Sequence, residues 1–252
     1  MHLNRLAALA RAQGGAALME FALVLPLLLL LGLGGLEVAR YVLTSFRLSL
    51  IAQEVADNAG RVRQALDESD VNELMIGAKL IGKGIDFANN GRIILSDLEQ
   101  RTTTTGTGGQ GTKTSANPNG YRQWIRWQRC AGALAKTSSY GGPLDINAAA
   151  VINLDATTNT DHGAVEGASA IDGMGPAGSQ IASSGGTAVM MVELWYNYAP
   201  LIPLYSWGAR TMHVTQAFNI RQRTDFSIYN ANRLSGTARA DCRLFNASIP
   251  TG

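Results

Sequence analysis

The sequence predicts an α+β fold in which one long N-terminal helix packs on an antiparallel sheet. Three features support it: an unbroken apolar run near the N-terminus, a helical apolar periodicity that continues beyond this run, and several apolar segments of strand length in the C-terminal part. The 252 residues suffice for one substantial domain and an anchor, or for two small domains.

The first element is an apolar segment from Ala16 to Leu36, in which Glu20 is the only charged residue. A helix of this length spans roughly 30 Å, the thickness of the hydrocarbon core of a bilayer. Pro26 is compatible with such a helix, because neighbouring groups in a membrane protein satisfy the freed carbonyl. The segment predicts a single transmembrane helix over residues 16–37.

The orientation of this helix follows from the charges beside it. Residues 1–15 contain Arg5 and Arg11 and no acidic residue, whereas the charges after the apolar segment are mixed in sign. The positive-inside rule places the N-terminus in the cytoplasm and everything beyond about residue 40 outside. We expect residues 1–15 to be a basic leader.

A cleaved secretory signal peptide is the alternative interpretation of this segment. Glu20 opposes it, because a signal peptide has no charge at the head of its apolar core. The stretch Leu36–Ala39 also lacks the small-x-small pattern of a signal-peptidase site. A membrane anchor is therefore favoured.

The helical pattern continues after the apolar segment. Apolar and small residues recur every three to four positions from Val38 to Leu66 without a proline, and the charged residues lie mainly on other faces. Residues 38–66 are therefore expected to be an amphipathic continuation of the same helix. Small side chains on its apolar stripe suit close packing against a sheet or another helix: Ser45, Ala52, Ala56 and Ala59.

Residues 67–252 are expected to form an extracytoplasmic α+β domain. Helical spacing predicts a short helix from about 70 to 85, and β-rich apolar segments predict four strands at about 92–100, 121–131, 187–198 and 210–221. Segments at about 102–120 and 155–186 are rich in glycine and small polar residues and predict flexible loops. Residues 138–186 contain at most one buried strand, at 148–154, and no pattern assigns 225–252.

The charge distribution argues against nucleic acid as a partner. Removing Arg5 and Arg11 from the 21 basic residues leaves 19, against 19 acidic residues. The main body is electroneutral and lacks the basic excess that nucleic-acid binding requires.

The two cysteines, Cys130 and Cys242, lie far apart in the sequence. In the cytoplasm they would most simply be two buried thiols. In an exported domain an even pair indicates a disulfide. Because the predicted topology places both outside the cytoplasm, we expect them to be bonded to each other.

No residue pattern predicts a metal, a cofactor or catalysis. His2, His162 and His213 are scattered, and there is no Cys-x-x-Cys or His-x₃-His pair. The glycine-rich stretch 173–178 lacks the lysine that follows in a phosphate-binding loop. We therefore expect no metal, no cofactor and no small-molecule substrate.

One weak pattern has the oxygen-ligand spacing of an EF-hand loop. Thr160 stands where that loop requires glycine, and no helices are predicted on either side. We interpret the segment as a solvated loop. The residues with this spacing are Asp155, Thr157, Asn159, Asp161 and Glu166.

The stretch Gly14–Phe21 resembles the cleavage region of type IV prepilins. A short basic leader ends in Gly15, and Glu20 follows five residues later at the head of a long apolar helix. The resemblance implies that a prepilin peptidase cuts between Gly15 and Ala16. The new amine on Ala16 is then expected to pair with Glu20 of the same chain or of a neighbour, because a lone carboxylate in lipid is costly.

More closely, Gly15–Arg63 resembles the TadE-like pseudopilins of the tight-adherence (Flp) pilus system. Their pattern is a glycine, Glu-Phe-Ala, a proline-containing leucine run, and then an acidic residue and an arginine, here Glu37 and Arg40. Thr187–Arg223 is similar to the closing hairpin of that family, and Trp127–Cys130 resembles longer members.

This resemblance implies a pilin-like architecture and a structural, non-enzymatic subunit that assembles with other pilins. It also implies residence in a bacterial inner membrane, with the main domain in the periplasm and with incorporation into the surface pilus as one outcome. Two other classes stay open: a bitopic receptor that never leaves the membrane, and an anchored extracytoplasmic enzyme.

The densest aromatic cluster lies in the expected closing hairpin. Because alternate residues of a strand face opposite sides, one core cannot bury all of it. Either the strand is covered on both faces within its own domain, or the cluster docks against a neighbouring subunit. The candidate interface residues are Trp195, Tyr198, Tyr205 and Trp207.

Overall fold

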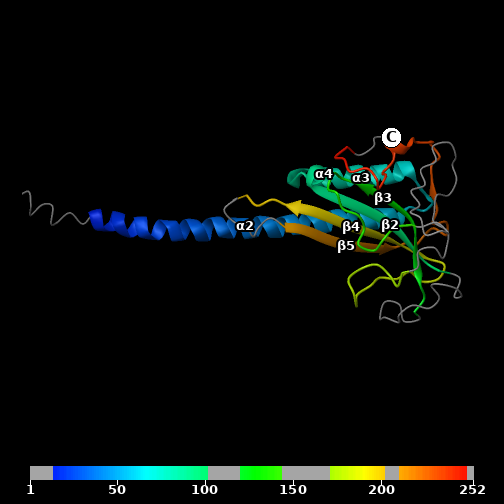
Figure 1. Ribbon diagram of the computed structural model, residues 1–252, viewed down its shortest axis with the longest axis horizontal. Helices are drawn as coiled ribbons and strands as arrows, with labels where there is room; N and C mark the ends of the chain where they lie inside the picture. Colours follow the sequence, from blue (N-terminus) through cyan, green and yellow to red (C-terminus); the bar gives the residue numbers. More distant parts are fainter. Residues whose placement is uncertain (1–13, 102–119, 144–170, 202–209, 249–252) are drawn as a thin grey trace, which may run out of the picture.

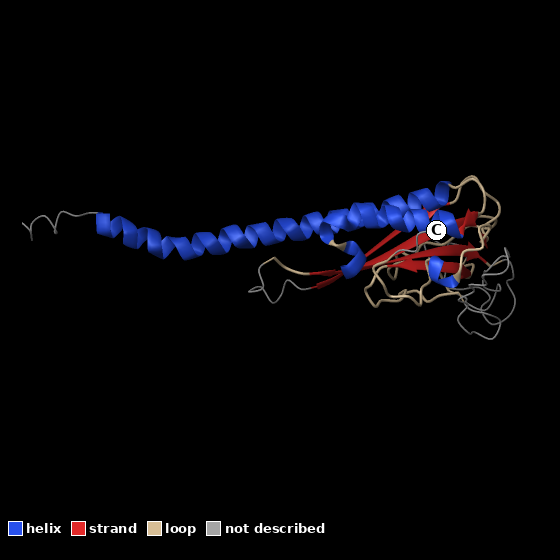
Figure 2. Cartoon of the chain, turned by 90° about the horizontal axis from the view of Figure 1, so that it is seen from above, coloured by secondary structure: helices blue, strands red, loops and turns tan. Residues whose placement is uncertain are grey.

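The computed structural model describes residues 14–101, 120–143, 171–201 and 210–248. A single long helix, α2 (Gly14–Arg61), extends far beyond a smaller body, and its second half covers one face of a sheet (Figures 1 and 2). The expected α+β class, with a long N-terminal helix on an antiparallel sheet, is confirmed.

The first half of α2 is exposed in the isolated chain, from Leu18 to Leu36. Pro26 lies within it without ending the helix. Within the described residues, α2 is the one helix whose length and composition fit a membrane span. The second half packs on the sheet, and of the small residues predicted for close packing Ala52, Ala56 and Ala59 are buried there, whereas Ser45 is half-buried.

The packing between α2 and the sheet is closest near the end of the helix. A Cβ atom at Gly60 would lie 2.3 Å from Cδ1 of Phe218 on strand β5 (Arg210–Asn219). The glycine therefore permits an approach that any other residue would obstruct. It explains the single glycine in the amphipathic half of the helix.

The helix ends at Arg61 rather than near Leu66. Leu66–Asp67 forms the short strand β1, which pairs in parallel with β6 (Ile228–Tyr229). Asp67 also caps the next helix: its carboxylate accepts a hydrogen bond from the Ser69 amide, and the Asp70 carboxylate accepts one from the Asp67 amide. This capping box starts α3 at Glu68, so α2 ends before the predicted position near Leu66.

The predicted second helix consists of three short pieces. They are α3 (Glu68–Ile81), the 3₁₀ turn η1 (Gly82–Ile85) and α4 (Phe87–Asn90). A further 3₁₀ turn, η2 (Gly236–Ala238), lies in the C-terminal tail.

Four strands form the main sheet: β2 (Gly91–Gln100), β3 (Gln123–Ala131), β4 (Ala188–Tyr198) and β5. Their spatial order is β3-β2-β4-β5, and every neighbouring pair is antiparallel. The four strands lie within a few residues of their predicted positions. Their order was not predictable from local patterns.

The two faces of the sheet hold separate apolar clusters. The larger cluster lies under α2 and α3. The smaller one lies on the opposite face and contains Met174, which is fully buried. Residues 171–186 of the expected flexible loop are therefore anchored, through Met174 and its bridge to Ile181. The other expected loop residues, 102–119 and 155–170, and the strand considered at 148–154 lie outside the described residues.

The C-terminal tail, which the sequence left unassigned, covers strand β3. The Cys130 amide donates to the Ala240 carbonyl over 3.0 Å. The indole Nε1 of Trp127 donates to the Phe226 carbonyl over 2.9 Å. Although β3 is at the edge of the sheet, most of its residues are buried.

Candidate functional site

The predicted cleavage site lies in the first turn of α2. Gly15, Ala16 and Glu20 are all exposed in the isolated chain. Within the described residues Glu20 has neither a hydrogen-bond partner nor an ion-pair partner. The single chain therefore leaves this carboxylate available for a partner, and its role stays a prediction.

A second site joins α2 to the end of strand β4. The Glu37 carboxylate accepts a hydrogen bond from the Tyr198 hydroxyl over 2.5 Å and one from the Leu201 amide over 2.9 Å. The rings of Tyr41 and Tyr198 meet edge to face, 5.3 Å between centroids at 82°. Glu37 and Tyr198 are both buried. The sequence named Glu37 only as part of a family pattern, because its partner lies 161 residues away.

This junction changes the interpretation of Tyr198. Burial, followed by the hydrogen bond to Glu37, raises the pKa of Tyr198 to about 12. The hydroxyl therefore stays protonated at neutral pH and remains a donor. Contacts within the chain account for the burial of this side chain without a neighbouring subunit.

Trp195 lies on the opposite face of the sheet and is half-buried. Its ring stacks on His213, 3.8 Å between centroids at 6°, and Lys136 Nζ lies 5.2 Å from the ring centroid. The structure describes two of the four predicted interface residues. Tyr198 is buried, whereas Trp195 is partly exposed. Tyr205 and Trp207 lie outside the described residues, and the interface itself stays a prediction.

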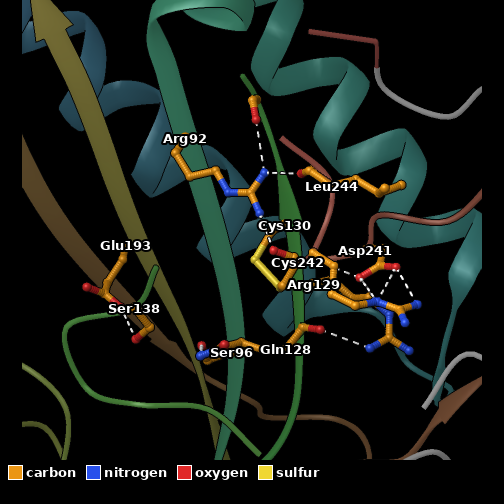
Figure 3. Close-up of a disulfide and its surroundings, with 12 residues drawn as sticks. Arg92, Ser96, Gln128, Arg129, Cys130, Ser138, Glu193, Asp241, Cys242 and Leu244 are labelled. Carbon is orange, nitrogen blue, oxygen red and sulfur yellow. Dashed lines mark hydrogen bonds and ion pairs between the residues drawn. A yellow bond between two sulfur atoms is a disulfide. The ribbon is translucent and has the colours of Figure 1, made fainter. Parts of the chain in front are cut away.

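The expected disulfide is present and attaches the tail to β3. Cys130 and Cys242 are joined with an S–S distance of 2.06 Å (Figure 3). Next to it, the buried Arg92 guanidinium donates to three backbone carbonyls: Gly132 at 2.9 Å, Leu244 at 2.5 Å and Cys242 at 2.7 Å. Burial lowers the pKa of Arg92 to about 10, which still leaves it charged at neutral pH. Arg92 therefore bonds both to the residue after β3 and to the C-terminal tail.

A buried ion pair lies nearby. Arg129 Nε and Nη2 donate to the Glu68 carboxylate over 2.9 and 2.5 Å, and Arg239 Nη1 lies 3.7 Å from the same group. These residues come from β3, the first turn of α3 and the tail. Removal of Glu68 would leave two buried guanidinium groups without this carboxylate, so the cluster fixes how the three segments fit together.

Asp97 on β2 is a buried carboxyl group without a hydrogen bond in the described part of the chain. It is fully buried, and neither carboxylate oxygen accepts a hydrogen bond there. Burial, and then the like charge of Glu99, raise the pKa of Asp97 well above its usual value, while Arg223 acts in the opposite direction. Arg223 Nη1 donates to the Ala59 carbonyl over 3.0 Å, in the last turn of α2.

One cluster contains the residue types of a hydrolase triad but not their arrangement. Glu193 accepts hydrogen bonds from the Ser138 hydroxyl and from the Ser139 amide, and His213 Nε2 lies 3.2 Å from it. A triad needs the histidine between the nucleophile and the acid, whereas here the glutamate is between serine and histidine. The cluster holds residues 138–140 against β4, and Figure 3 shows the contact between Ser138 and Glu193.

Within the described ranges, no group of three or more histidine, cysteine, aspartate or glutamate side chains is close enough together to hold a metal ion. The calcium-like pattern at 155–166 lies outside those ranges. A groove of about 480 Å³ between α2 and α3 is lined by apolar side chains and three acidic ones, Glu54, Asp70 and Glu73.

The fold and these sites define a class of protein: in its described residues, one helix fit to cross a bilayer carries a disulfide-linked sheet domain at its far end. Residues 15–57 match the family model described as TadE-like protein. The predicted resemblance is confirmed over this segment, which is consistent with a TadE-like protein of the tight-adherence pilus system, a structural and non-enzymatic kind of protein. The similarities at 127–130 and 187–223 lie outside the match and stay predictions. No curated protein and no solved structure matches the chain significantly.

Proposed function

We propose that this protein is a structural pseudopilin, or minor pilin, that takes part in assembly of a Flp pilus. Helix α2 anchors it in the bacterial inner membrane, with the N-terminus in the cytoplasm and the sheet domain in the periplasm. It has no catalytic role, and its partners are a prepilin peptidase and other pilins of the same system.

The observation that carries this proposal is the length of exposed apolar surface on α2. Exposed large apolar side chains continue from Leu18 to Leu50. At 1.5 Å per residue this stretch is about 48 Å long, whereas the hydrocarbon core of a bilayer is only about 30 Å thick. A membrane therefore covers only part of the stretch.

The remaining part lies on the side of α2 that its own sheet leaves open. Phe46 is 61% exposed, whereas Leu48 and Ile51, which face the sheet, are 0% exposed. Exposed apolar surface of this kind marks a contact with another protein, and the helix of a neighbouring subunit anchored in the same membrane fits it. The residues of this outer stripe are Val38, Val42, Leu43, Phe46 and Leu50.

Glu20 supports the same assignment. A carboxylate at the middle of a bilayer costs about 2.5–3.5 kcal/mol, and less near the interface. Cleavage between Gly15 and Ala16 would create an amine four residues before Glu20. An ion pair between that amine and Glu20 of a neighbour would set the axial register of adjacent helices, because other staggers leave the acid unpaired.

The outer stripe is tested by Phe46→Ser, with Gln53→Ser as the matched control on an exposed polar position of the same helix. Loss of a buried phenylalanine costs about 1.5–3 kcal/mol per contact, so sheared surface pili should decrease about tenfold or more. The variant should still insert and accumulate. Normal pili with Phe46→Ser would contradict the proposal.

The anchor is tested by N-terminal sequencing of the membrane-extracted protein. Cleavage predicts a sequence that begins Ala-Ala-Leu-Met-Glu, whereas an intact Met1 would favour the bitopic receptor. Glu20→Ala should still be inserted and cut but should not assemble with partner pilins. Normal assembly of that variant would remove the pairing role of Glu20.

A further inference from the structure

We infer that the outer edge of strand β5 binds an extended strand of a partner protein, which lengthens the sheet by one strand. β5 lies at one end of the sheet order, opposite β3. The two edges differ: β3 is covered by the disulfide-linked tail, whereas most residues of β5 are partly or fully exposed. Among the described residues, no other segment pairs with the outer edge of β5.

The register shows which backbone groups face outward. Ile220, the residue after β5, donates its amide to the Ala188 carbonyl over 3.0 Å, so this pair is hydrogen-bonded across β4 and β5. In an antiparallel ladder every second residue points both backbone groups at its neighbour, and the residues between them point both groups away. The pairing of β4 with β5 is unbroken. The residues whose N–H and C=O face outward are therefore Thr211, His213, Thr215, Ala217 and Asn219.

The edge of β5 lacks the features that normally prevent strand addition. Natural edges are protected by proline, lysine, inward-pointing charge or bulges. The segment Arg210–Asn219 contains no proline, lysine, aspartate or glutamate, its one arginine is the first residue, and its register with β4 has no bulge. A regular strand whose outward backbone groups pair with no described residue is a template for another extended chain.

The side chains of β5 define the chemistry of that chain. Val214 and Phe218 pack against the apolar cluster under α2, whereas His213 and Thr215 face the other side. A partner strand that alternates apolar and hydroxyl side chains continues both faces of the sheet.

A second copy of this chain does not fit the edge. A symmetric antiparallel pair of β5 strands would reverse one subunit, and because α2 runs along the strands, the two helices would point in opposite directions (Figures 1 and 2). Two helices inserted in one membrane with the same topology cannot point in opposite directions. This exclusion rests on the membrane anchoring proposed above. The β3 edge of another copy is covered by its own tail. We therefore commit to a strand of a different protein as the occupant, and binding of a second copy is an outcome of the tests below.

The first test measures amide hydrogen exchange in the full-length protein purified in detergent. The outward amides of Thr211, His213, Thr215 and Ala217 should exchange at least about a hundredfold faster than the inward amides of Met212, Val214 and Gln216. Equal protection of both sets would mean that the chain covers its own edge, for instance with residues 148–154, and would overturn the inference.

The second test adds a synthetic peptide of alternating valine and threonine, with one glutamate at each end. It should slow exchange of the outward amides at least about tenfold. Thr215→Pro removes an outward N–H without affecting the bonds to β4, so it should abolish this effect, while Thr215→Val should bind the peptide as the wild type does. Circular dichroism would check that both variants are folded.

Three outcomes would overturn the inference: no protection by the peptide, peptide binding to Thr215→Pro equal to that of Thr215→Val, or self-association of the purified protein that Thr215→Pro abolishes. The last would identify a second copy as the occupant. These measurements need no pilus, so they fail or succeed independently of the pilus experiments above.

Discussion

The hydroxyl of Tyr198 donates a hydrogen bond to the Glu37 carboxylate over 2.5 Å and joins the end of strand β4 to helix α2. Glu37 is the last residue of the expected transmembrane segment, so this contact lies where the helix leaves the membrane in the proposed topology. The Leu201 amide occupies the second carboxylate oxygen. The contact therefore orients the sheet domain relative to the apolar half of α2.

Tyr198→Phe should lower the free energy of unfolding by about 1–3 kcal/mol, because it leaves a buried carboxylate with one donor fewer. Chemical denaturation in detergent would measure it. Tyr41→Phe is the matched control: it removes a hydroxyl from the ring that contacts Tyr198, and this hydroxyl has no hydrogen bond among the described residues. Equal effects of the two substitutions would contradict the role of the Glu37 contact.

The same tyrosine predicts a loss of stability at alkaline pH. Its pKa in the folded protein, about 12, is above the ordinary value of 10. Ionisation therefore favours the unfolded chain, and the contribution of Tyr198 is fully present below pH 10 and is lost as the pH rises to about 12. The stability difference between wild type and Tyr198→Phe should narrow over this window, and a constant difference would refute the prediction.

Removal of the disulfide should destabilise the domain and release its tail. The bond closes a loop with a sequence separation of 112. In the chain-entropy model such a loop contributes about 4–5 kcal/mol at most. The double variant Cys130→Ala, Cys242→Ala should unfold at lower denaturant and expose the edge of β3 to hydrogen exchange. Recovery of two free thiols from native wild-type protein would disprove the bond.

Asp97→Asn should stabilise the protein at neutral pH by about 1–3 kcal/mol, because an amide avoids the cost of ionising a buried, unpartnered carboxyl. The pKa of Asp97 is raised in the folded state, so its contribution is present below about pH 4, near the ordinary aspartate value, and is lost as the pH rises through the folded pKa. The stability advantage of the asparagine variant should therefore grow with pH.

Asp57→Asn, in an i,i+4 surface pair with Arg61, is the control and should change stability by less than about 0.5 kcal/mol. An advantage that does not vary with pH would contradict the prediction.

Local patterns predicted the elements of the fold well. The period of the apolar residues and the absence of proline indicated the amphipathic half of α2, and Ala52 and Ala56 lie against the sheet as expected. The predicted end of that helix, near Leu66, was wrong. The capping box of Asp67 and Asp70 starts the next helix, and the spacing of apolar residues does not reveal such a cap.

The candidate sites were less predictable. Tyr198 was weighed between its own domain and a neighbouring subunit, and its contact with Glu37 was visible in no local pattern. Asp97 follows an apolar run on β2, where a register shift between Ser96 and Leu98 disturbs the alternation. The sequence therefore gave no indication of which face it occupies.

The sequence by itself determined the apolar helix that fits a membrane span, its amphipathic continuation, the strand positions and the family resemblance of residues 15–57, because each depends on neighbours a few positions apart. Only the tertiary structure decided the strand order, the cover of β3 by the tail, the place of β5 at the other end of the sheet and the Glu37–Tyr198 contact. The contacts between β2 and β4, between β3 and the tail, and between Glu37 and Tyr198 join groups far apart in the sequence, which come together because the whole chain buries its apolar surface at once and satisfies the polar groups that this burial encloses.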